Sequence, residues 1–207
     1  MAKGAFIFNI MARRYSRQPI ANQAAYEHKL KITRKYLTPN SEVLEIGCGT
    51  GSTAILHAPY VKHIFATDYA HKMIEIANEK KAADNVRNVD FEVAVIEDMP
   101  KEDGKYDVVL ALNIIHILED KPPALAKIYS LLKPGGYFIS STPCIEKITG
   151  VWWFLLQLFR LVGFPKMEGM TPEKLKGMIE DAGFKLVEEW APEGQPNVPF
   201  LVYSRPQ

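Results

Sequence analysis

The chain has 207 residues, a length that fits one α/β domain with a sizeable core. Its hydrophobic content of 47% and charged content of 24% are ordinary for a soluble globular protein, and its net charge of +1 gives no overall electrostatic case for binding nucleic acid. The two cysteines, Cys48 and Cys144, do not form a spaced framework, which argues against a disulfide scaffold or a metal site.

The apolar segments of the chain are short. Residues 6–11 form an apolar patch that is followed by arginines rather than by a small-residue cleavage site, so we expect no signal peptide. The most apolar run, residues 148–162, is shorter than the ~20 residues that span a bilayer, and it contains Arg160. We therefore expect a cytoplasmic protein without stable membrane insertion.

The first 40 residues predict two helices. Apolar residues recur at helical spacing over about residues 5–16 and again over about residues 20–36. The sequence Thr-Pro-Asn at residues 38–40 then ends the second helix. We expect residues 1–37 to form a helical cap on the domain.

A buried strand and three glycines come next. Residues 43–51 read Val-Leu-Glu-Ile-Gly-Cys-Gly-Thr-Gly, which predicts a strand, a tight turn and a helix start. The alternating glycines, Gly47, Gly49 and Gly51, accept positive φ and let the backbone approach a ligand. Their spacing differs from the dinucleotide fingerprint G-x-G-x-x-G, and no Lys-Ser or Lys-Thr follows them as in a P-loop.

Strands and helices alternate through the rest of the chain. Strands are expected over about residues 62–68, 89–94, 106–112 and 137–141, and helices over about residues 52–59, 69–83 and 121–132. This alternation predicts a parallel sheet with helices on both faces. Ligands then bind at the edge formed by the carboxyl ends of the strands.

Several motifs resemble the class I methyltransferases that use S-adenosylmethionine. The pattern E-x-G-x-G-x-G at residues 45–51 resembles their motif I, and Leu-Lys-Pro-Gly-Gly at residues 132–136 resembles the point where a helix gives way to a strand. The family also shows the unit that runs here from Thr-Pro-Glu to Ala-Gly-Phe, residues 171–184, and a last strand at residues 200–203. The resemblance covers about residues 40–206.

The resemblance implies a single methyltransferase domain over residues 1–207, with S-adenosylmethionine as its cofactor. The implied fold is α/β and Rossmann-like, with a doubly wound, seven-stranded, mostly parallel sheet whose seventh strand is antiparallel. Two helices precede the sheet, and an apolar helical insertion, residues 145–168, follows the fifth strand.

The chemistry of the cofactor assigns residues to its nucleoside end. Asp68 ends a strand about 20 residues beyond the first glycine and is expected to accept both ribose hydroxyls. Tyr69 and Ile96 are expected to supply apolar faces for adenine, and Glu97 or Asp98 an acceptor for its amino group. A plain surface loop is the alternative for the last two.

Two positions depart from the family pattern. Many relatives have Gly-Asp-Ala where this chain has Ala-Val-Ile at residues 94–96, so the usual aspartate is missing. Relatives often have a helix-capping serine at the position of Ala70. Its absence should cost roughly 1 kcal/mol unless another group caps that helix.

At the methionine end of the cofactor, the resemblance implies contacts with motif I and with Glu45. Asn113, at the end of the strand 106–112, resembles a residue that contacts the amino-acid portion. Tyr15 matches a tyrosine in the leading helices of relatives that covers the active site. Its ring near a sulfonium would be favourable by ~0.5–2 kcal/mol, which gives it a binding and a catalytic role, with core packing as the alternative.

Methyl transfer is an in-line displacement in which the protein aligns two reactants and excludes water. A hydroxyl or ammonium acceptor needs a base, and His116, three residues after Asn113, is the candidate. A thiol acceptor ionises more easily and could dispense with a base. His116 would then be a packing residue.

The acceptor side is expected in the insertion. Trp152 and Trp153 belong to a segment that is apolar almost all round, so as a helix it must be covered. A lid or wall over an apolar substrate is one interpretation, and core packing and an interfacial helix that docks on a membrane are two others.

These observations predict S-adenosylmethionine-dependent methylation of a small, largely apolar acceptor at O, N or S. Methylation of a membrane-associated lipid or quinone is one alternative. A nucleotide-dependent oxidoreductase and a non-catalytic binding protein are others. Nucleic acid is not expected as a partner, because no Asn-Pro-Pro-Tyr-like motif follows the fourth strand and no basic tail is present.

Overall fold

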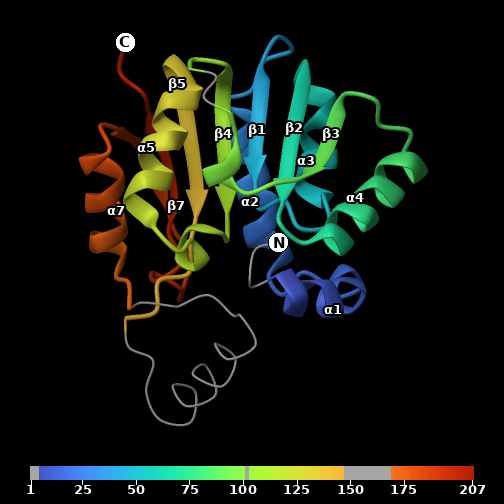
Figure 1. Ribbon diagram of the computed structural model, residues 1–207. Coiled ribbons are helices and arrows are strands. Elements are labelled where there is room, and N and C mark those ends of the chain that lie inside the picture. Colours follow the sequence, from blue (N-terminus) through green and yellow to red (C-terminus); the bar gives the residue numbers. More distant parts are fainter. Residues whose placement is uncertain (1–4, 101–102, 147–168) are drawn as a thin grey trace.

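The computed structural model describes residues 5–100, 103–146 and 169–207. Its seven-stranded sheet has the order β3-β2-β1-β4-β5-β7-β6 (Figure 1). The strands are β1 (Glu42–Ile46), β2 (His63–Asp68), β3 (Val89–Val93), β4 (Tyr106–Leu112), β5 (Leu132–Ser141), β6 (Lys185–Trp190) and β7 (Phe200–Ser204). Strands β1 to β5 pair in parallel, whereas β7 is antiparallel to both of its neighbours. The predicted sheet is confirmed.

Helices cover both faces of this sheet. One face packs against α2 (Gln23–Arg34), α3 (Ser52–His57) and α4 (His71–Ala83). The other packs against α5 (Lys121–Leu131) and α7 (Pro172–Asp181). Helix α1 (Ala5–Ser16) and the short turns η1 (Ala58–Tyr60), η2 (Ile96–Asp98) and η3 (Ile115–Ile117) complete the described elements. The two predicted N-terminal helices are present.

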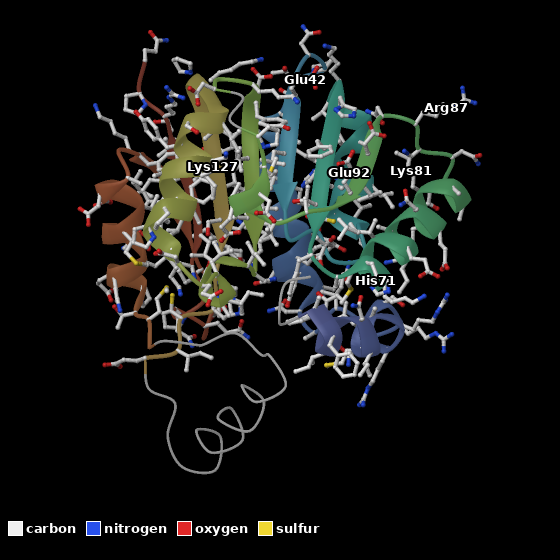
Figure 2. All side chains as sticks on the ribbon, viewed as in Figure 1. Glu42, His71, Lys81, Arg87, Glu92 and Lys127 are labelled. Carbon is white, nitrogen blue, oxygen red and sulfur yellow. The ribbon has the colours of Figure 1, made fainter. Side chains whose placement is uncertain are left out.

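The central strands are apolar on both faces because both faces are covered. In β1, Val43 joins the core on the α2 and α3 side, whereas Leu44 joins the core on the α5 side. The parallel strands all end at the same edge of the sheet. Figure 2 shows both edges: Glu42 marks the edge where β1 starts, and His71, just beyond the end of β2, marks the edge where the parallel strands end. Ligands of such sheets bind at this second, carboxyl edge.

Helix α1 lies beyond the carboxyl ends of β1 and β2 and packs on α4 (Figure 1). Ala70, at the N-cap of α4, provides no side-chain cap. Asn9 of α1 does so instead, because its Oδ1 accepts the N–H of Lys72 at 2.9 Å. An ion pair between Arg13 and Glu79, 3.1 Å, also joins the two helices. The missing serine is thus replaced by a residue from another helix.

The structure corrects the start of strand five and leaves the expected insertion after it untested. β5 begins at Leu132 rather than near residue 137, because Leu132 already pairs with Tyr106 before the register shifts. The expected insertion, with Trp152 and Trp153, falls almost wholly in residues 147–168, which lie outside the described residues. Among the described residues, no helix has the length and apolar character needed to cross a membrane.

Candidate active site

The glycine turn after β1 is built so that two glycines are packed and one is open. Gly47, Gly49 and Gly51 have φ of 67°, 54° and 74°. A Cβ on Gly47 would lie 2.8 Å from Ile114, and one on Gly51 would lie 2.6 Å from Phe91. At Gly49, the nearest atom would be Cε1 of Tyr15, at 3.8 Å. The turn therefore presents an open backbone surface at Gly49, with Tyr15 beside it.

Asp68 ties this turn to the start of α4. It is the last residue of β2, and only 7% of its surface is exposed. Its Oδ2 accepts the N–H of Gly49 at 3.0 Å, and its Oδ1 accepts the N–H of Ala70 at 2.9 Å. Burial raises the pKa of Asp68, and the two N–H donors counter that rise. Each oxygen keeps capacity for a further hydrogen bond, as a ribose diol requires.

Glu45 is a buried carboxyl with an unsatisfied oxygen. Its side chain is 3% exposed, and Oε2 has no hydrogen-bond partner in the described part of the chain. Burial, and then the charge of Asp68, raise the pKa of Glu45 to about 8. Glu45 is therefore largely protonated at neutral pH, and a cation or a donor brought by a ligand would satisfy it.

Tyrosines from both N-terminal helices stand beside these acids. Tyr15, 53% exposed, lies next to Gly49. The hydroxyl of Tyr26 lies 3.2 Å from Oγ1 of Thr53 in α3. Burial raises the pKa of Tyr26, and the nearby Glu45 and Tyr15 add to that rise. The sequence prediction missed Tyr26, although buried Leu30 four residues later marks the inward face of the same helix.

The residues predicted to hold adenine are dispersed. Tyr69 packs against Phe8 of α1, with ring centroids 5.4 Å apart, and its buried hydroxyl has no hydrogen-bond partner within the described residues. Ile96 is 1% exposed and belongs to the core on the α5 side. Glu97 and Asp98 are exposed in η2. The carboxyl groups of η2 thus face solvent, while the isoleucine packs inward.

Asn113 follows β4 and connects the cofactor side to β5. It adopts a φ of 59°, which is uncommon for a residue other than glycine. Its N–H donates to the carbonyl of Ser141 at 2.6 Å. The next residue, Ile114, contacts Gly47 of the glycine turn. Asn113 therefore stands between the glycine turn and the end of β5.

His116 lies in η3, three residues further on. Its Nδ1 is buried without a hydrogen-bond partner in the described ranges. Burial, with the charge of Lys121 as a second cause, lowers the pKa of His116 to about 4. The imidazole is thus neutral at physiological pH, and its reference pKa, on which the sequence interpretation relied, does not apply. No group of three or more metal-ligating side chains gathers within the described residues.

Comparisons with known proteins agree with this geometry. Residues 37–183 match a family model described as a methyltransferase domain. The chain is 31% identical over 169 residues to the ubiquinone/menaquinone biosynthesis C-methyltransferase UbiE of Geotalea daltonii. The aligned region covers 71% of this chain and 72% of UbiE. The chain therefore belongs to the family of class I, S-adenosylmethionine-dependent methyltransferases, and the predictions of fold, family and cofactor are confirmed.

Other relatives are much longer or match over less of the chain. The hybrid PKS-NRPS synthetase mpsA of Macrophomina phaseolina is 30% identical over 203 residues, which is 89% of this chain but 5% of the synthetase. The uncharacterized methyltransferase YcgJ of Bacillus subtilis is 31% identical over 97 residues, 47% of this chain and 38% of YcgJ. The crystal structure of YcgJ superposes with a TM-score of 0.69 and 18% identity over 87% of this chain and 99% of that one.

Proposed function

We propose that this protein is a cytoplasmic enzyme that methylates a small, largely apolar molecule at O, N or S, rather than nucleic acid. The observation that carries the proposal is the pair of buried acids, Glu45 and Asp68, beside an open glycine backbone. A protein that no longer bound cofactor would gain nothing from a buried carboxyl oxygen that lacks a partner.

The cofactor is proposed to extend along the β1 and β2 ends of the sheet. When bound, it supplies an activated methyl group on a sulfonium. Asp68 would accept hydrogen bonds from the ribose, and Glu45 would face the amino group at the methionine end. Tyr15, beside Gly49, would offer its ring to the sulfonium, an attraction of ~0.5–2 kcal/mol. Asn113 would complete the methionine end of this site.

The adenine end is proposed to lie over Tyr69 and η2. Tyr69 is covered by Phe8 of α1, which keeps water from one side of the ring. The exposed carboxylates of Glu97 and Asp98 offer acceptors for an amino group, and Ile96 would contribute only the apolar floor. Residues 1–37 would thus act as a cap over the cofactor.

His116 is proposed as the base for an acceptor that must lose a proton. Its pKa of about 4 keeps the imidazole neutral, so it can accept a proton over the whole physiological range. So low a pKa makes it a weak base, so it would take the proton only as the acceptor becomes acidic during its attack on the methyl group. We place Trp152 and Trp153, in the lid-like insertion 145–168, on the acceptor side.

A membrane-borne quinone or lipid is the second candidate acceptor. Its support is the similarity to UbiE, together with an apolar surface on α1. Phe6 and Ile10 are 65% and 67% exposed there. An acceptor dissolved in a membrane would need such a surface for access.

The test is transfer of a labelled methyl group from S-adenosylmethionine to separate panels of thiols, phenols, amines and a short-chain quinol. We expect label in one small-molecule class, and at a cofactor concentration below the wild-type affinity we expect the rate of labelling to fall at least about tenfold in Asp68→Ala. Label found only in protein or nucleic acid, or an unchanged rate of labelling in Asp68→Ala, would overturn the proposal.

A further inference from the structure

A lysine of α2, distinct from the residues proposed to hold the cofactor, reaches the end of β5. Lys29 lies in α2, and its Nζ donates to Oγ of Ser141, the last residue of β5, at 2.8 Å. The lysine is half-buried, and its Nζ lies 6.0 Å from the centroid of the buried Phe200 ring. An ammonium has three N–H donors, so this hydroxyl satisfies only one of them.

The charge of Lys29 is not balanced within the described part of the chain. No carboxylate there forms an ion pair with it, whereas Lys35, two turns along, pairs with Glu188 at 2.8 Å. Burial lowers the pKa of Lys29, and no neighbouring charge opposes this effect. A partly desolvated cation without a counter-ion is unfavourable until an anion binds to it.

Lys29 reaches the end of β5, whereas Asp68, which is proposed to bind the ribose, ends β2 on the other side of β1 and β4. The carbonyl of Ser141 accepts the N–H of Asn113, and Ile114 next to it contacts the glycine turn. β5 is separated from β1 by β4, so at ~4.8 Å per strand its end lies roughly 10 Å from the end of β1. A methyl acceptor in line with the cofactor would occupy this region.

We infer that Lys29 binds a carboxylate on the methyl acceptor, with the Ser141 hydroxyl as a second donor. The inference rests on the proposed function and narrows its substrate class to an apolar molecule that carries one acidic group. One ammonium and one hydroxyl match a single negative charge. A phosphate dianion would call for further cationic groups, and within the described residues Lys29 is the one cation recorded in a side-chain hydrogen bond with Ser141.

The experiment compares benzoate with benzamide as matched charged and neutral probes. Both are titrated by calorimetry into protein saturated with S-adenosylhomocysteine, using wild type, Lys29→Met and Lys31→Met. Lys31 is an exposed lysine on the same helix, so Lys31→Met is the matched control. We expect wild type and Lys31→Met to bind benzoate at least about tenfold more tightly than benzamide, and Lys29→Met to lose that preference. Affinity for S-adenosylhomocysteine should be the same in all three.

Three results would overturn the inference. One is a wild type without preference for benzoate, a result that does not depend on how well any variant folds. Another is a preference that survives in Lys29→Met. The third is a loss of S-adenosylhomocysteine affinity by about tenfold in Lys29→Met alone, which would assign the ammonium to the carboxylate of the cofactor. Failure of wild type to bind S-adenosylhomocysteine would contradict the proposed function itself.

Discussion

The two halves of the carboxyl edge are built in different ways. At the ends of β1 and β2, the proposed cofactor site consists mainly of backbone groups and the buried acids Glu45 and Asp68, and Asp68 accepts the N–H groups of Gly49 and Ala70. At the ends of β4 and β5, side chains from distant elements meet, as Lys29 of α2 meets Ser141. The first half suits a cofactor that is the same throughout a family. The second can change with the acceptor, because a side chain can be replaced without altering the backbone.

The backbone half should be the more fragile under substitution. Gly51→Ala adds a Cβ 2.6 Å from Phe91 and 2.8 Å from Ala77, at a φ of +74°. Left-handed strain and overpacking together should reduce the free energy of unfolding by ~2–5 kcal/mol, measured by urea denaturation.

Gly194→Ala is the matched control for that variant. Gly194 has a φ of +72°, but apart from its two chain neighbours no atom of the described residues lies within 4 Å of its added Cβ. It should lose only the strain contribution, ~1–2 kcal/mol. Equal losses of unfolding free energy in the two variants would show that close packing around the glycine turn does not make this half more sensitive to substitution.

The buried acid of the cofactor half should give stability a pH dependence. The pKa of Glu45 rises from its ordinary 4.5 to about 8 on folding, so the unfolded chain binds fewer protons between those values. The stabilisation from protonated Glu45 is complete below pH 4.5 and is lost as pH rises through 8, by roughly 1.4 kcal/mol per pH unit at most.

Urea denaturation between pH 5 and pH 8 checks this expectation. Glu45→Gln should flatten the decline in the free energy of unfolding, because an amide does not titrate. Glu92→Gln, at an exposed site on β3 that Figure 2 labels, should retain the decline. A wild type and a Glu45→Gln variant with parallel pH profiles would remove Glu45 as the cause.

In the acceptor half, the sharpest single-residue test concerns His116. We expect His116→Ala to lower kcat by about 100-fold while the affinity for S-adenosylhomocysteine stays unchanged, because general-base catalysis contributes factors of that size. Wild type should show no His116 titration near pH 6.5, since its pKa is about 4. His63→Ala, at the opposite edge of the sheet, serves as the control. An unchanged kcat in His116→Ala would favour an acceptor that ionises without a base.

The smallest expected effect concerns the helix that covers the cofactor half. Asn9→Ala removes the cap that α1 supplies to α4 and should cost ~1 kcal/mol of unfolding free energy. Ala70→Ser, in the Asn9→Ala background, should restore much of that loss by providing a cap on α4 itself. A thermal melt of the two variants checks both. No loss in Asn9→Ala would mean that the cap does not stabilise this junction.

The contrast between the halves also explains what the sequence could predict. The sheet and its carboxyl edge follow from alternating apolar strands and helices, and the glycine turn and Asp68 follow from local spacing. The contact between Lys29 and Ser141 joins residues 112 positions apart, and no local pattern indicates it. Nor does any local pattern indicate the pKa of His116, because burial depends on the tertiary fold.

Calorimetric titration of S-adenosylhomocysteine into wild type, Asp68→Ala and Asp90→Ala tests the central claim most directly. Asp90 lies on the neighbouring strand β3, where its exposed carboxylate pairs with Lys81 at 3.4 Å, so its variant is the control. We predict tight binding by wild type and Asp90→Ala and at least tenfold weaker binding by Asp68→Ala, a loss of ~1.4 kcal/mol or more. Equal affinity in all three proteins, or no binding by wild type, would contradict this prediction.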